Sequence, residues 1–308
     1  MHRFMLAGMC IVASSLVSPP PLDARQRETR TIYVTVFDSK GVPQTDLEAP
    51  DFELRAGGRP LEILRAEAAQ AAMRVALIVS DAGTGGFQAS IASFIQKLLG
   101  KAEFSLVTVI TQPEVTMPYT SLGADLREGI RRVGPRGRLP GAGAQLMEAI
   151  QETIKGVRTD GKRPVILVLR VGNEGVTPLD GDQVRDQLRQ SGALMYVVST
   201  LGATRAAAPS ARAGISTEQA QMQDEEVRTS TLNLGQVLGD GSRESGGRHD
   251  QVVSTTLIPS LERVAEELLS QYALTFVIPD RFKPNDKISV STKRKGTKVQ
   301  APVRLPTK

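Results

Sequence analysis

The sequence MRVALIVSDAGTGG, at residues 73–86, decides the fold class of this chain. Its apolar part, Val75 to Val79, is rich in β-branched residues and uninterrupted, which is typical of a strand buried on both faces of a parallel sheet. Asp81 follows directly, and Gly83 and Gly85 come after it in a glycine-rich turn. Open α/β sheets bind their ligands at the carboxyl ends of such strands, so any small-ligand site is expected in this turn.

The segments that follow alternate between strands and helices. Apolar residues at helical spacing predict helices at residues 87–99, 122–133, 144–154, 182–190 and 257–271. Apolar runs predict further strands at residues 104–111, 114–119, 163–171 and 194–200, with 114–119 as an antiparallel edge strand. We therefore expect an α/β domain over residues 73–271, with a doubly wound, mostly parallel sheet and helices on both of its faces.

Short strands are predicted at both ends of the mature chain. Residues 29–68 contain several short β patterns around the Gly57-Gly58 turn, and residues 272–308 contain β patterns around a polar turn. The first module is too small to bury much core alone. We expect the two segments to pack together as one small β appendage on the α/β domain.

Residues 203–250 have few apolar side chains. A structureless loop of this length is uncommon inside a compact domain, so it is either partly helical or mobile. Ser216 to Gln219 has the pattern of a capping box, which predicts a polar helix running to about Thr229. A second short helix is expected at Leu232 to Leu238, and the segment as a whole is interpreted as a flexible insertion.

Composition indicates a globular protein and argues against nucleic-acid binding. The 308 residues are 40% hydrophobic and 23% charged, with a net charge of +5, as in an ordinary globular protein. Basic residues are spread out and aromatic residues make up only 4%, so we expect no nucleic-acid partner.

The first 24 residues have the pattern of a signal peptide. A short basic start precedes an apolar run from Phe4 to Val17, and small residues up to Ala24 suit cleavage. The run is too short for a stable transmembrane anchor. Cys10, the sole cysteine, lies inside this leader, so the mature chain has no disulfide and no thiolate metal site. We expect an exported protein, periplasmic or extracellular.

The strand ending on Asp81 and the elements after it resemble a von Willebrand factor type A domain. The mature chain is also similar to the VWFA-related exported proteins of bacteria. That narrower resemblance depends on Val42 to Ile63, on the turn Ser245-Gly246-Gly247-Arg248 and on the helix-to-strand segment Val264 to Leu274. It implies a Rossmann-like fold and a non-enzymatic role in adhesion or scaffolding, with an unidentified protein as partner.

The resemblance also implies where a metal would bind. Type A domains hold Mg²⁺ or Mn²⁺ with an Asp-x-Ser-x-Ser loop, a Thr from a second loop and an Asp after the fourth strand. The matching positions here are Asp81, Gly83, Gly85, Ala144 and Val171, of which only Asp81 carries a side-chain oxygen. One carboxylate does not outcompete water for a cation that dehydrates reluctantly, so we expect a degenerate site without cofactor.

Asp81 then needs another role. We interpret its carboxylate as an acceptor for the backbone N–H groups of the glycine-rich turn, which lies at the start of the next predicted helix. Asn at this position is expected to keep most of that role, and Ala to lose it.

Two alternatives remain open. Ser80, Thr84, Asn173 and Glu174 lie close in sequence and are possible substitute ligands, which would make the protein a Mg²⁺- or Mn²⁺-dependent adhesin with a non-standard ligand set. An enzyme would need converging titratable groups. The only histidine of the mature chain, His249, falls in the predicted flexible insertion, which argues against a Ser-His-Asp triad.

Overall fold

The computed structural model describes residues 28–137, 144–159, 161–172, 174–200, 216–278 and 287–305. The predicted leader, residues 1–24, and the candidate ligand Asn173 lie outside these ranges. Within the described ranges, no helix combines the length and the apolar character needed to cross a membrane.

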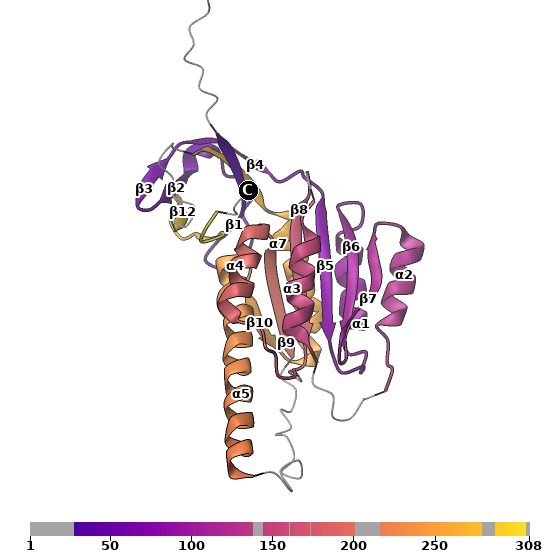
Figure 1. Cartoon of the computed structure of the whole chain (residues 1–308). Coiled ribbons are helices and arrows are strands. Elements are labelled where there is room, and N and C mark those ends of the chain that lie inside the picture. Colours follow the sequence, from indigo (N-terminus) through magenta and orange to yellow (C-terminus); the bar gives the residue numbers. More distant parts are fainter. Residues whose placement is uncertain are drawn as a thin grey trace, which may run out of the picture.

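A six-stranded sheet forms the centre of the α/β domain (Figure 1). In spatial order its strands are β10 (His249–Val252), β9 (Leu194–Thr200), β8 (Arg163–Arg170), β5 (Met73–Ser80), β6 (Ala102–Val109) and β7 (Pro113–Thr120). All neighbouring strands run parallel except β7, which is antiparallel to β6. Counted from β5, this is the doubly wound order 3-2-1-4-5-6, so the predicted fold class is confirmed.

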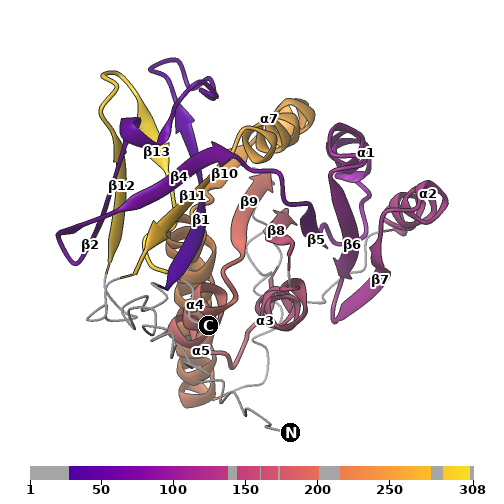
Figure 2. The ribbon, with the colours of Figure 1, turned by 90° about the horizontal axis from the view of Figure 1, so that it is seen from above.

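Helices cover both faces of this sheet (Figure 2). One face carries α1 (Gln88–Lys97), α2 (Gly123–Arg132) and α7 (Leu257–Leu269), and the other carries α3 (Leu146–Val157), α4 (Gly181–Ser191) and α5 (Thr217–Gln236). Successive side chains of a strand point to opposite faces. In β5, Val75, Leu77 and Val79 therefore pack into the first core, while Ala76 and Ile78 pack into the second. The uninterrupted apolar run reflects this burial on both sides.

The two ends of the chain share two small sheets. One contains β13 (Lys298–Gln300), β1 (Thr29–Phe37), β11 (Tyr272–Val277) and β4 (Ile63–Ala68), and the other contains β12 (Ile288–Thr292), β2 (Phe52–Ala56) and β3 (Arg59–Leu61). Their apolar faces enclose a third core that includes Val34, Phe52 and Leu274. The predicted β appendage from both chain ends is confirmed.

The segment after β9 is more ordered than the sequence indicated. Ser216 caps α5 in a capping box with Gln219, as predicted, but the helix continues unbroken to Gln236. A π-helical segment (Val237–Gly241), α6 (Ser242–Glu244) and β10 follow, and β10 completes the main sheet.

The expected helix break near Thr229 does not occur because the next turn of α5 is fixed by tertiary contacts. Ser230 and Leu234 are buried, and the Ser230 hydroxyl accepts a hydrogen bond from the Thr177 N–H group at 2.7 Å. The interpretation as a flexible insertion is therefore wrong for residues 216–250, and residues 203–215 lie outside the described part of the chain.

The turn at residues 245–248 joins the α/β domain to the β appendage. Gly246 has φ +90°, and a Cβ atom there would lie 2.7 Å from the Pro302 nitrogen. A Cβ atom at Gly247 would overlap the Met195 carbonyl oxygen. The Gln300 amide donates to the Gly246 carbonyl at 2.9 Å. Two glycines are needed here because β9 and the C-terminal segment both press against this backbone.

Candidate functional site

The switch point of the sheet lies between β5 and β8, where the strand order reverses and where ligands bind in open α/β folds. Asp81 follows the end of β5, and Val171 follows the end of β8. The Val171 N–H group donates to the Ser80 carbonyl at 3.0 Å. Candidate residues that are 90 positions apart in sequence thus meet at one edge of the sheet.

Asp81 is buried, with 5% of its surface exposed, and its carboxylate is bound by its own turn. Oδ1 accepts from the Gly83 N–H group at 2.9 Å, and Oδ2 accepts from the Gly85 N–H group at 2.7 Å. Both oxygens are therefore engaged in ordering the turn. Asn offers only one side-chain oxygen, so the expectation that Asn would keep most of this role is corrected.

The backbone of this turn suits glycine. Ala82 has φ +54°, Gly83 +75° and Gly85 +73°, all in the left-handed region that costs an L-residue about 1–2 kcal/mol. Residues 135–137, which follow α2, lie against the turn: the Arg136 N–H group donates to the Gly83 carbonyl at 2.8 Å.

The same segment fills the positions where hydroxyl side chains would start. A Cβ atom at Gly83 would lie 2.8 Å from the Gly137 oxygen, and one at Gly85 would lie 2.6 Å from Pro135 Cδ. A serine at either position does not fit unless residues 135–137 move. No pattern in the sequence indicates this contact, because it joins two loops about 50 residues apart.

Ala144 and Val171 add no polar side-chain atom to the site. Ala144 is buried, forms a parallel bridge with Glu174, and accepts from the Gly175 N–H group through its carbonyl at 3.0 Å. The Val171 side chain packs against the first core. The structure brings both residues to the predicted edge, but with apolar side chains.

Of the described substitute candidates, Ser80 and Glu174 are directed or paired elsewhere, whereas Thr84 lies in the Asp81 turn itself. Ser80 is buried and, by strand parity, points to the opposite face of the sheet from Asp81. The Thr84 hydroxyl donates to Asp81 Oδ2 at 3.4 Å and accepts from the Gly86 N–H group at 3.3 Å. Glu174, whose side chain is 9% exposed, forms a bidentate ion pair with Arg170 at 2.6 and 2.5 Å. In the described part of the chain, no three His, Cys, Asp or Glu side chains are grouped to hold a metal ion.

A serine and a histidine that the sequence did not bring together lie near this edge. His249 is on β10 rather than in a flexible segment, and its Nε2 lies 2.7 Å from Ser199 Oγ at the end of β9. Burial and the nearby Arg170 guanidinium lower the pKa of His249, so its imidazole is neutral at pH 7.

This Ser–His contact supplies two of the three groups of a catalytic triad, and no carboxylate among the described residues is shown to complete it. The Asp250 carboxylate accepts from Arg248 at 2.7 Å, and Ser199 is 6% exposed. A substrate would have to displace the chain that covers the hydroxyl. The pair was missed because 50 residues separate its members and because β10 has no clear sequence pattern.

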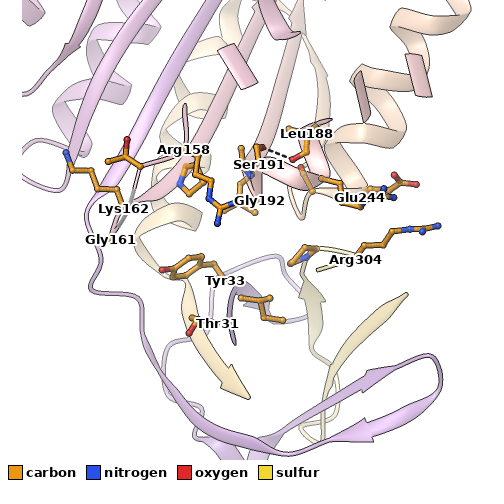
Figure 3. Close-up of a pocket in the computed structure, with 18 residues that line it drawn as sticks. Thr31, Tyr33, Arg158, Gly161, Lys162, Leu188, Ser191, Gly192, Glu244 and Arg304 are labelled. Atoms are coloured by element: carbon orange, nitrogen blue, oxygen red, sulfur yellow. Dashed lines mark hydrogen bonds between the residues drawn. The ribbon is translucent and has the colours of Figure 1, made fainter. Parts of the chain in front are cut away.

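A cavity of about 230 Å³ lies at the opposite edge, between the amino ends of β8 and β9 and the β appendage. Figure 3 shows Arg158 projecting between Gly192 and Tyr33. Arg158 donates to the Gln190 carbonyl at 3.4 Å, near the carboxyl end of α4. Cations at helix carboxyl ends stabilise the helix dipole, so this charge has a structural role.

No protein-family model and no curated protein sequence matches the chain. Among solved structures, it is similar to a von Willebrand factor type A protein from Catenulispora acidiphila, with 12% identity over 85% of this chain and 75% of that one and a TM-score of 0.45. An aerotolerance-related membrane protein from Bacteroides fragilis shares 13% identity over 64% and 98% of the two chains, with a TM-score of 0.44. The pilus adhesin SpaC from Lactobacillus rhamnosus GG shares 9% identity over 83% and 48%, with a TM-score of 0.41. The strand order of this chain, 3-2-1-4-5-6 with an antiparallel edge strand, is that of a Rossmann-like α/β fold, which is the fold implied by the resemblance to type A domains.

Proposed function

We propose that this chain is an exported, non-enzymatic protein-binding module that binds its partner without a divalent cation at the switch point. The observation that carries the proposal is the engagement of both Asp81 oxygens by the Gly83 and Gly85 N–H groups. In this module the position that a metal would occupy is a closed, internally bonded turn.

Three features support the loss of metal binding. Mg²⁺ requires near-octahedral oxygen ligands at about 2.0–2.1 Å. The Asp81 carboxylate already accepts two backbone N–H groups, and the other four positions, Gly83, Gly85, Ala144 and Val171, supply no side-chain oxygen to complete a ligand set. Glu174 could join it only by breaking a bidentate pair with Arg170, which would leave that guanidinium without its carboxylate.

The biological setting follows from the leader and the composition. A signal peptide at residues 1–24 would direct the chain out of the cytoplasm, and the mature chain contains no cysteine. Its stability would then come from the three apolar cores alone. A periplasmic or extracellular role in adhesion or scaffolding fits a domain of this kind.

Thermal unfolding with and without cation tests the proposal. The wild type and Asp81→Ala are melted in EDTA and in millimolar Mg²⁺ or Mn²⁺. A ligand present at 100 times its dissociation constant stabilises by about 2.7 kcal/mol, which raises the melting temperature by several degrees. We expect no cation-dependent shift in either protein.

A shift in the wild type that Asp81→Ala removes would instead establish the alternative, a Mg²⁺- or Mn²⁺-dependent adhesin. Glu174→Gln then shows whether that carboxylate has left Arg170 to become a ligand. A shift that survives in Asp81→Ala would place the cation elsewhere on the molecule.

A further inference from the structure

The first half of α5 projects beyond the carboxyl ends of the strands (Figure 1). Every residue from 217 to 229 is exposed except Ala220, which is half-buried. The second half is held against the body, where Ser230 and Leu234 are buried and the Asn233 amide donates to the Leu179 carbonyl at 3.1 Å. Within the described residues, the helix is thus anchored at one end and largely exposed at the other.

A helix in this situation lacks the usual source of helical stability. Isolated helices shorter than about 12–15 residues are marginal in water, and most helices in proteins are stabilised by packing an apolar stripe. An ion pair between Arg228 and Glu225, at 3.0 Å on the surface, adds only a few tenths of a kcal/mol. Covering this half of α5 would therefore stabilise it.

An open groove runs along the projecting half, next to the loop between β8 and α4. It has a volume of about 450 Å³ and is lined by Met222, Glu225, Glu226, Thr229 and, in the anchored half, Asn233 of α5, facing Thr177 and Pro178. Met222 is 61% exposed. Met222 and Pro178 offer apolar surface, while Glu225 and Glu226 place carboxylates beside it.

The charge of this half of α5 is opposite to that of the whole chain. Residues 217–229 contain four acidic residues and one basic residue, a net charge of −3, whereas the chain carries +5. Complementary charge selects partners and accelerates their encounter. The groove therefore favours a basic partner and disfavours an acidic one.

We infer that this groove binds a basic, amphipathic helical segment of a partner protein. Apolar side chains of that segment would cover Met222 and Pro178, and its Lys or Arg side chains would reach Glu225 and Glu226. This is the helix-in-groove mode of recognition. The inference rests on the proposed protein-binding function, and it adds the binding face and the chemistry of the partner.

Two synthetic helical peptides test this docking surface. One contains Leu and Lys, and the other has the same Leu positions with Glu in place of Lys. Binding to the full chain is measured by fluorescence anisotropy in EDTA, and hydrogen exchange locates the contact. We expect the Leu/Lys peptide to bind and to protect the amides of residues 217–229. Its binding should weaken as the salt concentration rises. The Leu/Glu peptide should not bind.

Matched variants separate the groove from general charge attraction. Glu225→Lys/Glu226→Lys should weaken the binding of the Leu/Lys peptide by more than about tenfold. Glu53→Lys/Glu67→Lys changes the charge equally at two exposed positions of the β appendage and should leave binding unchanged. Met222→Gln should weaken binding, whereas Leu232→Gln should not, because Leu232 is exposed on the same helix but does not line the groove.

Protection outside α5, equal effects of the two charge-reversal pairs, or absence of binding would each overturn the inference. Failure of the proposed function has a different readout. A melting temperature that depends on Mg²⁺ or Mn²⁺ through Asp81 would reject cation-independent recognition, whatever the peptides do.

Discussion

A Cβ atom at Gly85 would lie 2.6 Å from Cδ of Pro135, so the loop after α2 closes the position where a serine side chain would begin. The loop and the turn are also joined through the Arg136 N–H group and the Gly83 carbonyl. Restoring a hydroxyl to the turn therefore requires movement of a second loop and not just a change of residue.

Gly85→Ser should destabilise the protein without creating a cation site. Crowding a packed position costs about 1–3 kcal/mol, in addition to about 1–2 kcal/mol for an L-residue at φ +73°. Gly100→Ser is the matched control, since Gly100 also has φ +73° but has no atom within 4 Å of a built Cβ. Urea unfolding should show the larger loss for Gly85→Ser, and equal losses would mean that the contact with Pro135 is unimportant.

Replacement of Asp81 should give a graded loss of stability. Asp81→Ala leaves the Gly83 and Gly85 N–H groups without their acceptor. A buried, unsatisfied donor lowers the free energy of unfolding by about 1–3 kcal/mol. Asp81→Asn keeps one oxygen and should fall between Ala and the wild type. The free energies of unfolding, measured in urea, give this order. The order should be the same in EDTA and in Mg²⁺. Wild-type stability in Asp81→Asn would show that one acceptor suffices.

The fold could be predicted from the sequence because its signals are local. The apolar run at Val75 to Val79 and the helical spacing at residues 257–271 need no knowledge of the rest of the chain. The shared β appendage followed from one physical argument, that two short β segments cannot each bury a core.

The details of the site depend on contacts between distant segments. The continuity of α5 is set by Thr177 and Leu179, which anchor its second half. The loop over Gly85, the pairing of Glu174 with Arg170 and the approach of His249 to Ser199 likewise depend on tertiary structure. Such contacts leave no periodic pattern, so the positions of the site residues and the local hydrogen bonds of Asp81 were predictable, but the contacts between distant segments were not.

Arg248 should contribute to stability mainly because it neutralises the buried Glu267 carboxylate. The Glu267 side chain is 1% exposed and is ion-paired with Arg248. Arg248→Met removes the partner and should cost about 3–5 kcal/mol, whereas Arg248→Met/Glu267→Leu should recover much of that loss. A double-mutant cycle in urea measures the difference. Additive losses would show that the pair is not coupled.

The stability of the protein should depend on pH through His249. Burial and the Arg170 guanidinium hold the pKa of His249 below its usual value, so the unfolded chain takes up this proton first as the pH falls. The stabilising contribution of neutral His249 is therefore complete above the unfolded pKa of about 6.5, declines as the pH falls towards the folded pKa, and then levels off.

His249→Gln removes this titration while keeping a side chain that can hydrogen-bond to Ser199. Free energies of unfolding of the wild type and His249→Gln, measured between neutral and mildly acidic pH, should therefore diverge below about pH 6.5, with the wild type losing more. Ser199→Ala keeps the buried imidazole near Arg170 and should retain the wild-type decline. His2 is common to all three proteins, so its titration cancels. Parallel curves for the wild type and His249→Gln would show that His249 accepts its proton equally well in the folded protein.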